Sequence, residues 1–176
     1  MSTTISFERL FSKFLQKIEG YDLFLPNITK EMRIALITGY FETAVSEPYV
    51  RRLFSAVLID EPTYIGDGDD KILIDGSFEF SMNDATDEKA DSDFVLNVIA
   101  LGMARAWVDP KVNSATSLLQ LVGTSDEKWT SQALHMKELS SLRESLEIQQ
   151  RNLIRDRGFI DNDYLKGKSK TSGLRG

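Results

Sequence analysis

Acidic clusters are the first places in this 176-residue sequence where chemistry could occur. The run Asp67-Gly68-Asp69-Asp70 suggests a calcium-binding loop, because closely spaced carboxylates are the ligands of an EF-hand. A loop of that kind beginning at Asp67 needs glycine at its sixth position and glutamate at its twelfth, where the chain has Ile72 and Phe78. The pattern therefore favours a solvated hairpin tip over a calcium site.

Residues that could act as nucleophiles or transition-metal ligands are scarce. There are no cysteines, which excludes disulfides, thiol catalysis and thiolate metal sites, and His135 is the single histidine. A histidine without a base partner is typical of helix capping or packing. The sequence also lacks phosphate-binding glycine loops, nucleophile elbows and metal-protease helices. We therefore expect a protein that is not an enzyme and that uses neither a cofactor nor a metal.

The net charge of −6 is distributed unevenly. Residues 60–93 contain twelve acids against Lys71 and Lys89, so this segment carries −10 and the rest of the chain +4. Such a segment would keep an edge strand from aggregating or, if it faced a channel, would repel DNA. No apolar run approaches the ~18 residues of a membrane span, and the N-terminus lacks the pattern of a secretion signal. A soluble protein made in a cytoplasm is expected.

Apolar spacing predicts the helices that must hold these residues in place. They are expected over residues 7–18, 29–46, 94–107, 115–122 and 131–157. Together with a small sheet, they give an α+β, mainly α fold: a helical bundle with a long C-terminal helix and a small antiparallel β-sheet insertion.

Capping residues mark the first two of these helices. Ser6 precedes the first helix and Gly20 follows it, as expected of an N-cap and a C-terminal stop. The second helix should begin near Thr29 and end at Glu47-Pro48, because a residue before proline disfavours the helical conformation. Its apolar face is expected to group Met32, Leu36, Ile37, Tyr40, Phe41, Ala44 and Val45.

The helix over residues 94–107 is apolar almost all round, which predicts a buried central helix. Asp109-Pro110 is expected to break it, after which Ser114 caps a short helix and Gly123 ends that helix. The last helix would be roughly 40 Å long at 1.5 Å per residue, so its far end should project from the core or lie against a neighbour. Its leucines at coiled-coil-like spacing are Leu139, Leu142, Leu146 and Leu153.

Alternating and β-branched residues predict strands over 50–60, 71–75 and 77–81, with Gly76 separating the last two. We expect one helical domain over residues 1–158, with the sheet and its acidic loop inserted at 49–82. Residues 159–176 have little to bury and are expected to form a basic tail.

Arginines on the last predicted helix raise the question of nucleic-acid binding. Arg143, Arg151, Arg155 and Arg157 are interleaved with acids, and Glu147 stands four residues from both Arg143 and Arg151. That arrangement is typical of a solvated helix face. Only the tail is cleanly basic.

Part of the sequence resembles a known family. ALGMARAWVDPKVNS, followed by LLQLVGTSDEKWTSQALHMKELSSLRESLE, resembles tailed-phage head–tail connector (neck or adaptor) proteins. The shared features are a helix that ends in tryptophan and proline, a glycine-threonine turn, a Ser-Gln-Ala helix start and a long helix rich in leucine and arginine. The resemblance is strongest over residues 94–154 and continues weakly into the two N-terminal helices.

The resemblance implies a virion structural protein of the neck, assembled in the host cytoplasm. It would form a ring homo-oligomer, expected to be a dodecamer, on the portal vertex, and DNA would pass through the ring without sequence-specific binding. Its partners would be the portal protein and a tail or second neck protein, with no membrane. Alternatives are a tail-completion or terminator ring protein and, from a different class, a small DNA-binding regulator that uses the tail and the long helix.

Two groups of residues are the candidate sites under this interpretation. The acidic loop at the channel or rim comprises Asp67, Asp69 and Asp70. The predicted oligomer and portal interface comprises Leu139, Arg143, Arg151, Arg155, Tyr164, Leu165, Lys166, Lys168, Lys170, Leu174 and Arg175.

Overall fold

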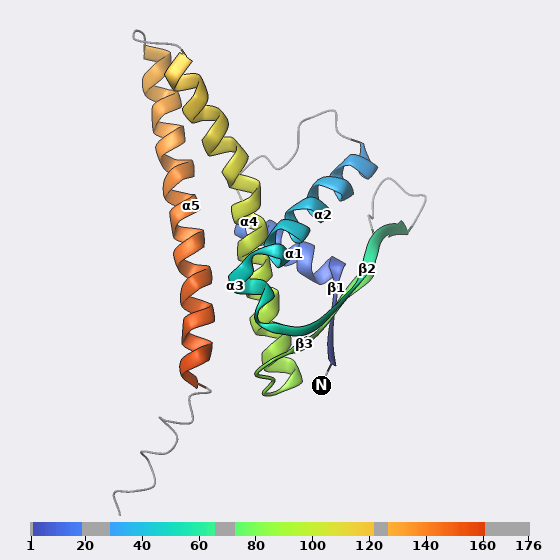
Figure 1. Ribbon diagram of the computed structural model, residues 1–176. Helices are drawn as coiled ribbons and strands as arrows, with labels where there is room; N and C mark the ends of the chain where they lie inside the picture. Colours follow the sequence, from blue (N-terminus) through green and yellow to red (C-terminus); the bar gives the residue numbers. More distant parts are fainter. Residues whose placement is uncertain (1, 19–28, 66–72, 122–126, 161–176) are drawn as a thin grey trace, which may run out of the picture.

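The computed structural model describes residues 2–18, 29–65, 73–121 and 127–160 (Figure 1). It confirms a mainly α, α+β fold with a small antiparallel sheet and a long C-terminal helix. The elements, in chain order, are β1 (Ser2–Ser6), α1 (Phe7–Lys17), α2 (Lys30–Ser46), α3 (Pro48–Arg51), β2 (Phe54–Ile65), β3 (Leu73–Met82), α4 (Glu88–Leu121) and α5 (Glu127–Ile160).

The sheet has the strand order β1-β3-β2, with both pairs antiparallel. Its third strand, β1, comes from the N-terminus and was not predicted, because the alternation of buried Thr3 and Ile5 with exposed serines and threonine is very short. The sheet is therefore not confined to an insertion at 49–82. The strand expected to start at residue 50 starts at Phe54, since Pro48 begins the helical turn α3.

The two short strands predicted on either side of Gly76 form the single strand β3. Gly76 has φ 101° and stands where the register with β2 shifts between Asp60 and Thr63. A Cβ at this position would lie 2.7 Å from the carbonyl oxygen of Asp60. Gly76 therefore permits a bulge inside a ladder and does not end a strand.

Aromatic side chains fill the core between the sheet and the helices. Phe41 of α2 contacts Phe7 of α1 at 5.0 Å between ring centroids and Phe78 of β3 at 5.4 Å, both edge to face. Trp107 of α4 is also fully buried. The predicted cap Ser6 accepts a hydrogen bond from the N–H of Arg9, and Thr29 accepts one from Met32. These contacts fix how α1 and α2 enter the core.

Part of the predicted apolar face of α2 is wrong. Ile37, Phe41, Ala44 and Val45 are buried, but Met32 and Leu36 are exposed. The N-terminal part of α2 extends past the elements that cover its other end (Figure 1), so the apolar stripe is longer than the surface available to bury it.

Helix α4 continues through Asp109-Pro110, contrary to the predicted break, and Ser114 lies inside it rather than capping a second helix. An interior proline costs about 3 kcal/mol through a lost hydrogen bond and a steric clash. Burial of Trp107, Val108 and Val112 around it offsets that cost. The predicted stop at Gly123 lies outside the described residues, as does Gly20.

Helix α4 also begins earlier than predicted, at Glu88. Asp87 accepts a hydrogen bond of 3.1 Å from the N–H of Ala90, as an N-cap does. Helix α5 is likewise longer than predicted, and together the two helices form a hairpin that extends beyond the body of the domain (Figure 1). The end of α5 that projects is its N-terminal end. Its C-terminal end, which was expected to project or to lie against a neighbour, is instead joined to the start of α4 by the ion pair of Arg157 with Asp91.

Candidate assembly interface

Helix α5 packs antiparallel to α4 along its apolar stripe. Leu139 and Leu146 are buried in the core, and Leu142 packs against its edge. Leu139 therefore faces the chain's own core and is not part of the exposed surface. Arg143 is half-exposed and turns towards α4, where its Nε lies 2.6 Å from Oδ1 of Asp109.

The remaining predicted arginines are exposed but paired. Nη2 of Arg151 lies 2.6 Å from Oε1 of Glu147, and Nη2 of Arg155 lies 3.1 Å from Oδ1 of Asp156. Exposed pairs of this kind contribute little to stability, but they neutralise the positive charge that phosphate binding would require. The described part of α5 is therefore a mixed-charge surface, as its sequence predicts.

The other predicted interface residues lie outside the described part of the chain. So do the acidic-loop residues Asp67, Asp69 and Asp70 and the side chain of His135. The interface residues in this group are Tyr164, Leu165, Lys166, Lys168, Lys170, Leu174 and Arg175.

A polar network that the sequence did not reveal joins α3, α4 and α5. Arg105 donates to the hydroxyl of Tyr49 at 2.6 Å and forms an ion pair with Glu47. The Tyr49 hydroxyl donates to Oε1 of the buried Gln150 at 2.8 Å, and Nε2 of Gln150 donates to the carbonyl of Val98 at 2.9 Å. This network fixes the position of α5 along the axis of α4.

The network also shifts two pKa values. Burial raises the pKa of Tyr49, although Arg105 opposes the shift. Burial alone would lower the pKa of Arg105, but Tyr49 and Glu47 outweigh it and raise that pKa. Arg105 therefore stays charged, and the Tyr49 hydroxyl keeps its proton at neutral pH.

A second ion pair anchors the C-terminal end of α5. Nη2 of Arg157 lies 2.5 Å from Oδ1 of Asp91 and 2.9 Å from the carbonyl oxygen of Asp84. The guanidinium carbon lies 4.5 Å from the ring centroid of Phe94. Burial would raise the pKa of Asp91, but hydrogen bonds from Arg157 and Thr86 lower it overall. This arginine, counted with the solvated face in the sequence, is a structural anchor.

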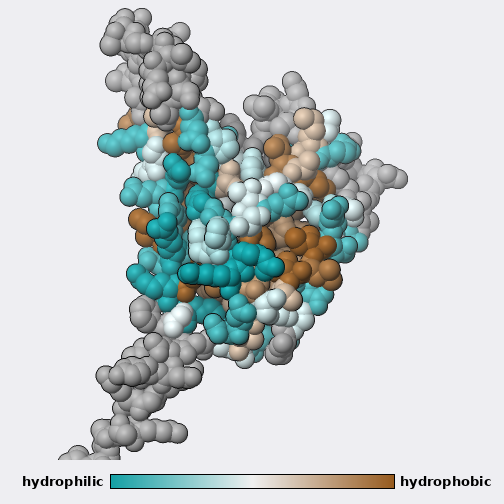
Figure 2. Space-filling model, in the orientation of Figure 1, coloured by the Kyte–Doolittle hydropathy of each residue, from teal (hydrophilic) through white to brown (hydrophobic). Residues whose placement is uncertain are grey.

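Two exposed apolar surfaces lie on different sides of the domain. On α5, Leu134 and Ile148 are 60% and 51% exposed and share one stripe; we call this the α5 patch. On the edge strand β2, Leu58 is 64% exposed, and Ile59, which points to the opposite face of the strand, is 41% exposed; we call the apolar sheet edge that they form the β2 patch. Figure 2 shows hydrophobic residues gathered over β2, whereas the α5 side of the same view is largely hydrophilic. Helix α5 and strand β2 lie at opposite sides of the molecule in Figure 1.

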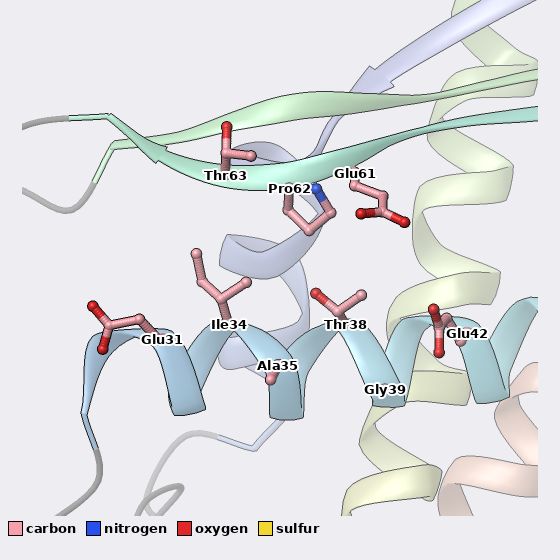
Figure 3. A pocket seen from close by; sticks show the side chains of 9 residues that line it. All are labelled: Glu31, Ile34, Ala35, Thr38, Gly39, Glu42, Glu61, Pro62 and Thr63. Carbon is pink, nitrogen blue, oxygen red and sulfur yellow. The ribbon is translucent and has the colours of Figure 1, made fainter.

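An acid-lined cleft of about 500 Å³ opens between α2 and β2. Figure 3 shows Glu42 of α2 and Glu61 of β2 at one end of it and Glu31 at the other. Ile34 and Pro62 line the middle. Sequence reasoning missed this cleft, because its two walls are separated along the chain and only the fold brings them together.

Comparison with known proteins gives no relative: no family, no curated protein and no solved structure matches this chain. Among the residues that the structure describes, no group of three or more histidine, cysteine, aspartate or glutamate side chains could hold a metal ion. None of the described helices is long and apolar enough to cross a membrane.

Proposed function

We propose that this protein is a virion structural protein of a tailed bacteriophage that forms a ring at the head–tail junction. Copies of the chain join the portal protein to the tail or to a second neck protein, and DNA passes through the ring. The proposal rests on the sequence resemblance over residues 94–154.

The structural observation that carries the proposal is the position of the two exposed apolar patches. A closed ring requires a heterologous contact, in which one surface of a subunit meets a different surface of the next. The α5 patch and the β2 patch lie on opposite sides of the domain and have different shapes, a convex helix and a sheet edge. Contact between the α5 patch of one copy and the β2 patch of the next would repeat around a ring.

The charges on α5 favour assembly over the alternative of a DNA-binding regulator. Arg143, Arg151 and Arg155 are each paired with a carboxylate. A site that binds phosphates needs cations whose charge is not already neutralised.

Two matched variants test the ring contact. Ile148→Arg and Leu58→Arg each place a charge in one patch, while Lys89→Ala alters an exposed position on a different element, at the start of α4. We expect the wild-type protein and the control to form rings of roughly twelve copies on portal-bearing particles, and both arginine variants to remain monomeric.

Electron microscopy of particles and analytical ultracentrifugation of the purified chain give the readout. Loss of the ring in the two patch variants, with an unchanged melting temperature, supports the proposal. A chain that stays monomeric, is absent from particles and binds DNA with a steep dependence on salt would overturn it in favour of the regulator.

A further inference from the structure

The cleft between α2 and β2 carries negative charge at the end where Glu42 and Glu61 lie. Within the described residues, the carboxylates of Glu42 and Glu61 have no ion-pair partner, in contrast to Glu147 and Asp156 of α5. They converge on the same end of the cleft from opposite walls (Figure 3). Two converging carboxylates favour a cationic group between them.

The middle of the cleft is suited to an aliphatic chain. Ile34 of α2 points towards β2, which carries Pro62 (Figure 3), and Ala35 also lines the cleft. Oγ1 of Thr38, in the same wall, is buried and has no hydrogen-bond partner among the described residues. A lysine or arginine side chain combines an apolar stem with a cationic head, and a peptide backbone beside it would supply a donor for Thr38.

Gly39 keeps this space open. A Cβ added to Gly39 would meet no atom within 4 Å, so no close packing requires glycine there. A glycine in a helix interior is about 1 kcal/mol less favourable than alanine. Close packing around Gly39 does not offset this cost, but the absence of a side chain leaves room for a ligand along α2.

We propose that the α2–β2 cleft binds the basic C-terminal segment, residues 164–176, of a neighbouring copy of this chain. That segment contains Lys166, Lys168, Lys170 and Arg175 and no acid, so its charge complements the cleft. The inference rests on the proposed function, since it requires copies to stand side by side.

A neighbouring copy is favoured over the same copy by the position of α5. The C-terminal end of α5 lies at the far side of the domain from the cleft (Figure 1). In a ring that joins the α5 patch of one copy to the β2 patch of the next, the segment leaving α5 starts beside the neighbour that carries the cleft. The basic segment would then act as a strap across each subunit contact.

A labelled peptide of residues 161–176 tests the docking directly. We expect saturable binding to the full-length protein, measured by fluorescence anisotropy at concentrations where the protein is monomeric. The double variant Glu42→Gln/Glu61→Gln should bind about tenfold more weakly or worse, because it removes two charge-assisted contacts. The control Glu8→Gln/Glu144→Gln removes the same charge from exposed helix positions and should bind as the wild type does.

Steric filling gives a second, charge-independent test. Gly39→Leu should abolish peptide binding by occupying the cleft, and a circular dichroism melt shows whether the variant is folded. Gly39→Ala is the matched smaller change and should weaken binding less. Gly39→Leu that melts like the wild type and still binds the peptide would overturn the proposal.

Two further results would also overturn it. One is a peptide of scrambled sequence that binds as tightly as residues 161–176, which would assign the cleft to any cation. The other is ring formation unchanged by Glu42→Gln/Glu61→Gln, which would leave the proposed function standing without the strap. Conversely, a chain that forms no rings but binds the peptide in the cleft would contradict the proposed function alone.

Discussion

The α4–α5 contact and the α2–β2 cleft both bring charged side chains together, but only in the α4–α5 contact do described residues of opposite charge pair with them. Between α4 and α5, Arg157 is held by Asp91 and Arg143 by Asp109, so charge is neutralised inside the domain. In the cleft, Glu42 and Glu61 face each other without a described counter-charge. Neutralised charge fixes the fold, whereas charge left open at a surface is available to a partner.

Removing the anchor of α5 should have the largest effect on stability. Arg157 and Asp91 side chains are only 13% and 5% exposed, so Arg157→Ala leaves a buried carboxylate without its partner. We expect a loss of about 3–5 kcal/mol in the free energy of unfolding, measured by denaturant titration. Arg155→Ala, at an exposed pair, is the control and should cost less than about 1 kcal/mol. Equal effects would show that the anchor is no stronger than a surface pair.

Crowding the helix contact should have an intermediate effect. A Cβ on Gly102 would lie 2.8 Å from Cβ of Ala44 and 2.8 Å from Nε2 of Gln150. Gly102→Ala should therefore destabilise the protein by about 1–3 kcal/mol despite the better helix propensity of alanine. Thermal melting checks this, and a raised melting temperature would mean that α2 and α5 can move apart without cost.

Acid should weaken the same anchor through the titration of Asp91. The pKa of Asp91 is lowered below its ordinary 3.8 in the folded chain, so the carboxylate stabilises the fold above pH 3.8. That contribution is lost as the pH falls through the lowered folded-state pKa. Between pH 6 and pH 2 the free energy of unfolding of the wild type should fall more steeply than that of Asp91→Asn. Parallel curves would remove Asp91 from the acid response.

The smallest effect is expected in the cleft, and with the opposite sign. Gly39→Ala should raise the free energy of unfolding by up to about 1 kcal/mol, because alanine is the better helix former and meets no atom there. The same variant should bind the peptide of residues 161–176 more weakly. A gain in stability with unchanged peptide binding would argue against a role for Gly39 in the cleft.

Several elements could be predicted because their signals are local. Ser6 and Thr29 cap α1 and α2 as expected, and the apolar run from residue 94 forms the buried centre of α4. The predicted break of α4 at Pro110 was wrong, because tertiary packing around Trp107 outweighs the tendency of a single proline to end a helix. Strand β1 was missed because an alternation of buried and exposed residues over only five positions does not distinguish a strand from an irregular segment before a helix.

The candidate sites divide in the same way. Pairing of Glu147 with Arg151 follows from their separation by four residues and was predicted. The contact of Arg143 with Asp109 and the anchor of Arg157 to Asp91 join positions far apart in sequence. No local pattern contains such pairs, so the chain must fold before they can be found.

By itself, the sequence determined the composition of the parts: a mainly helical chain, a buried central helix, a mixed-charge surface on α5 and a basic C-terminal segment. Helix and strand periodicity, capping and charge counts are properties of neighbouring residues, which is why they could be derived without a structure. Only the tertiary structure decided which charges are neutralised and that α2 and β2 enclose an acidic cleft. Those outcomes depend on which distant residues packing brings together, because burial and Coulomb interactions depend on distance in space.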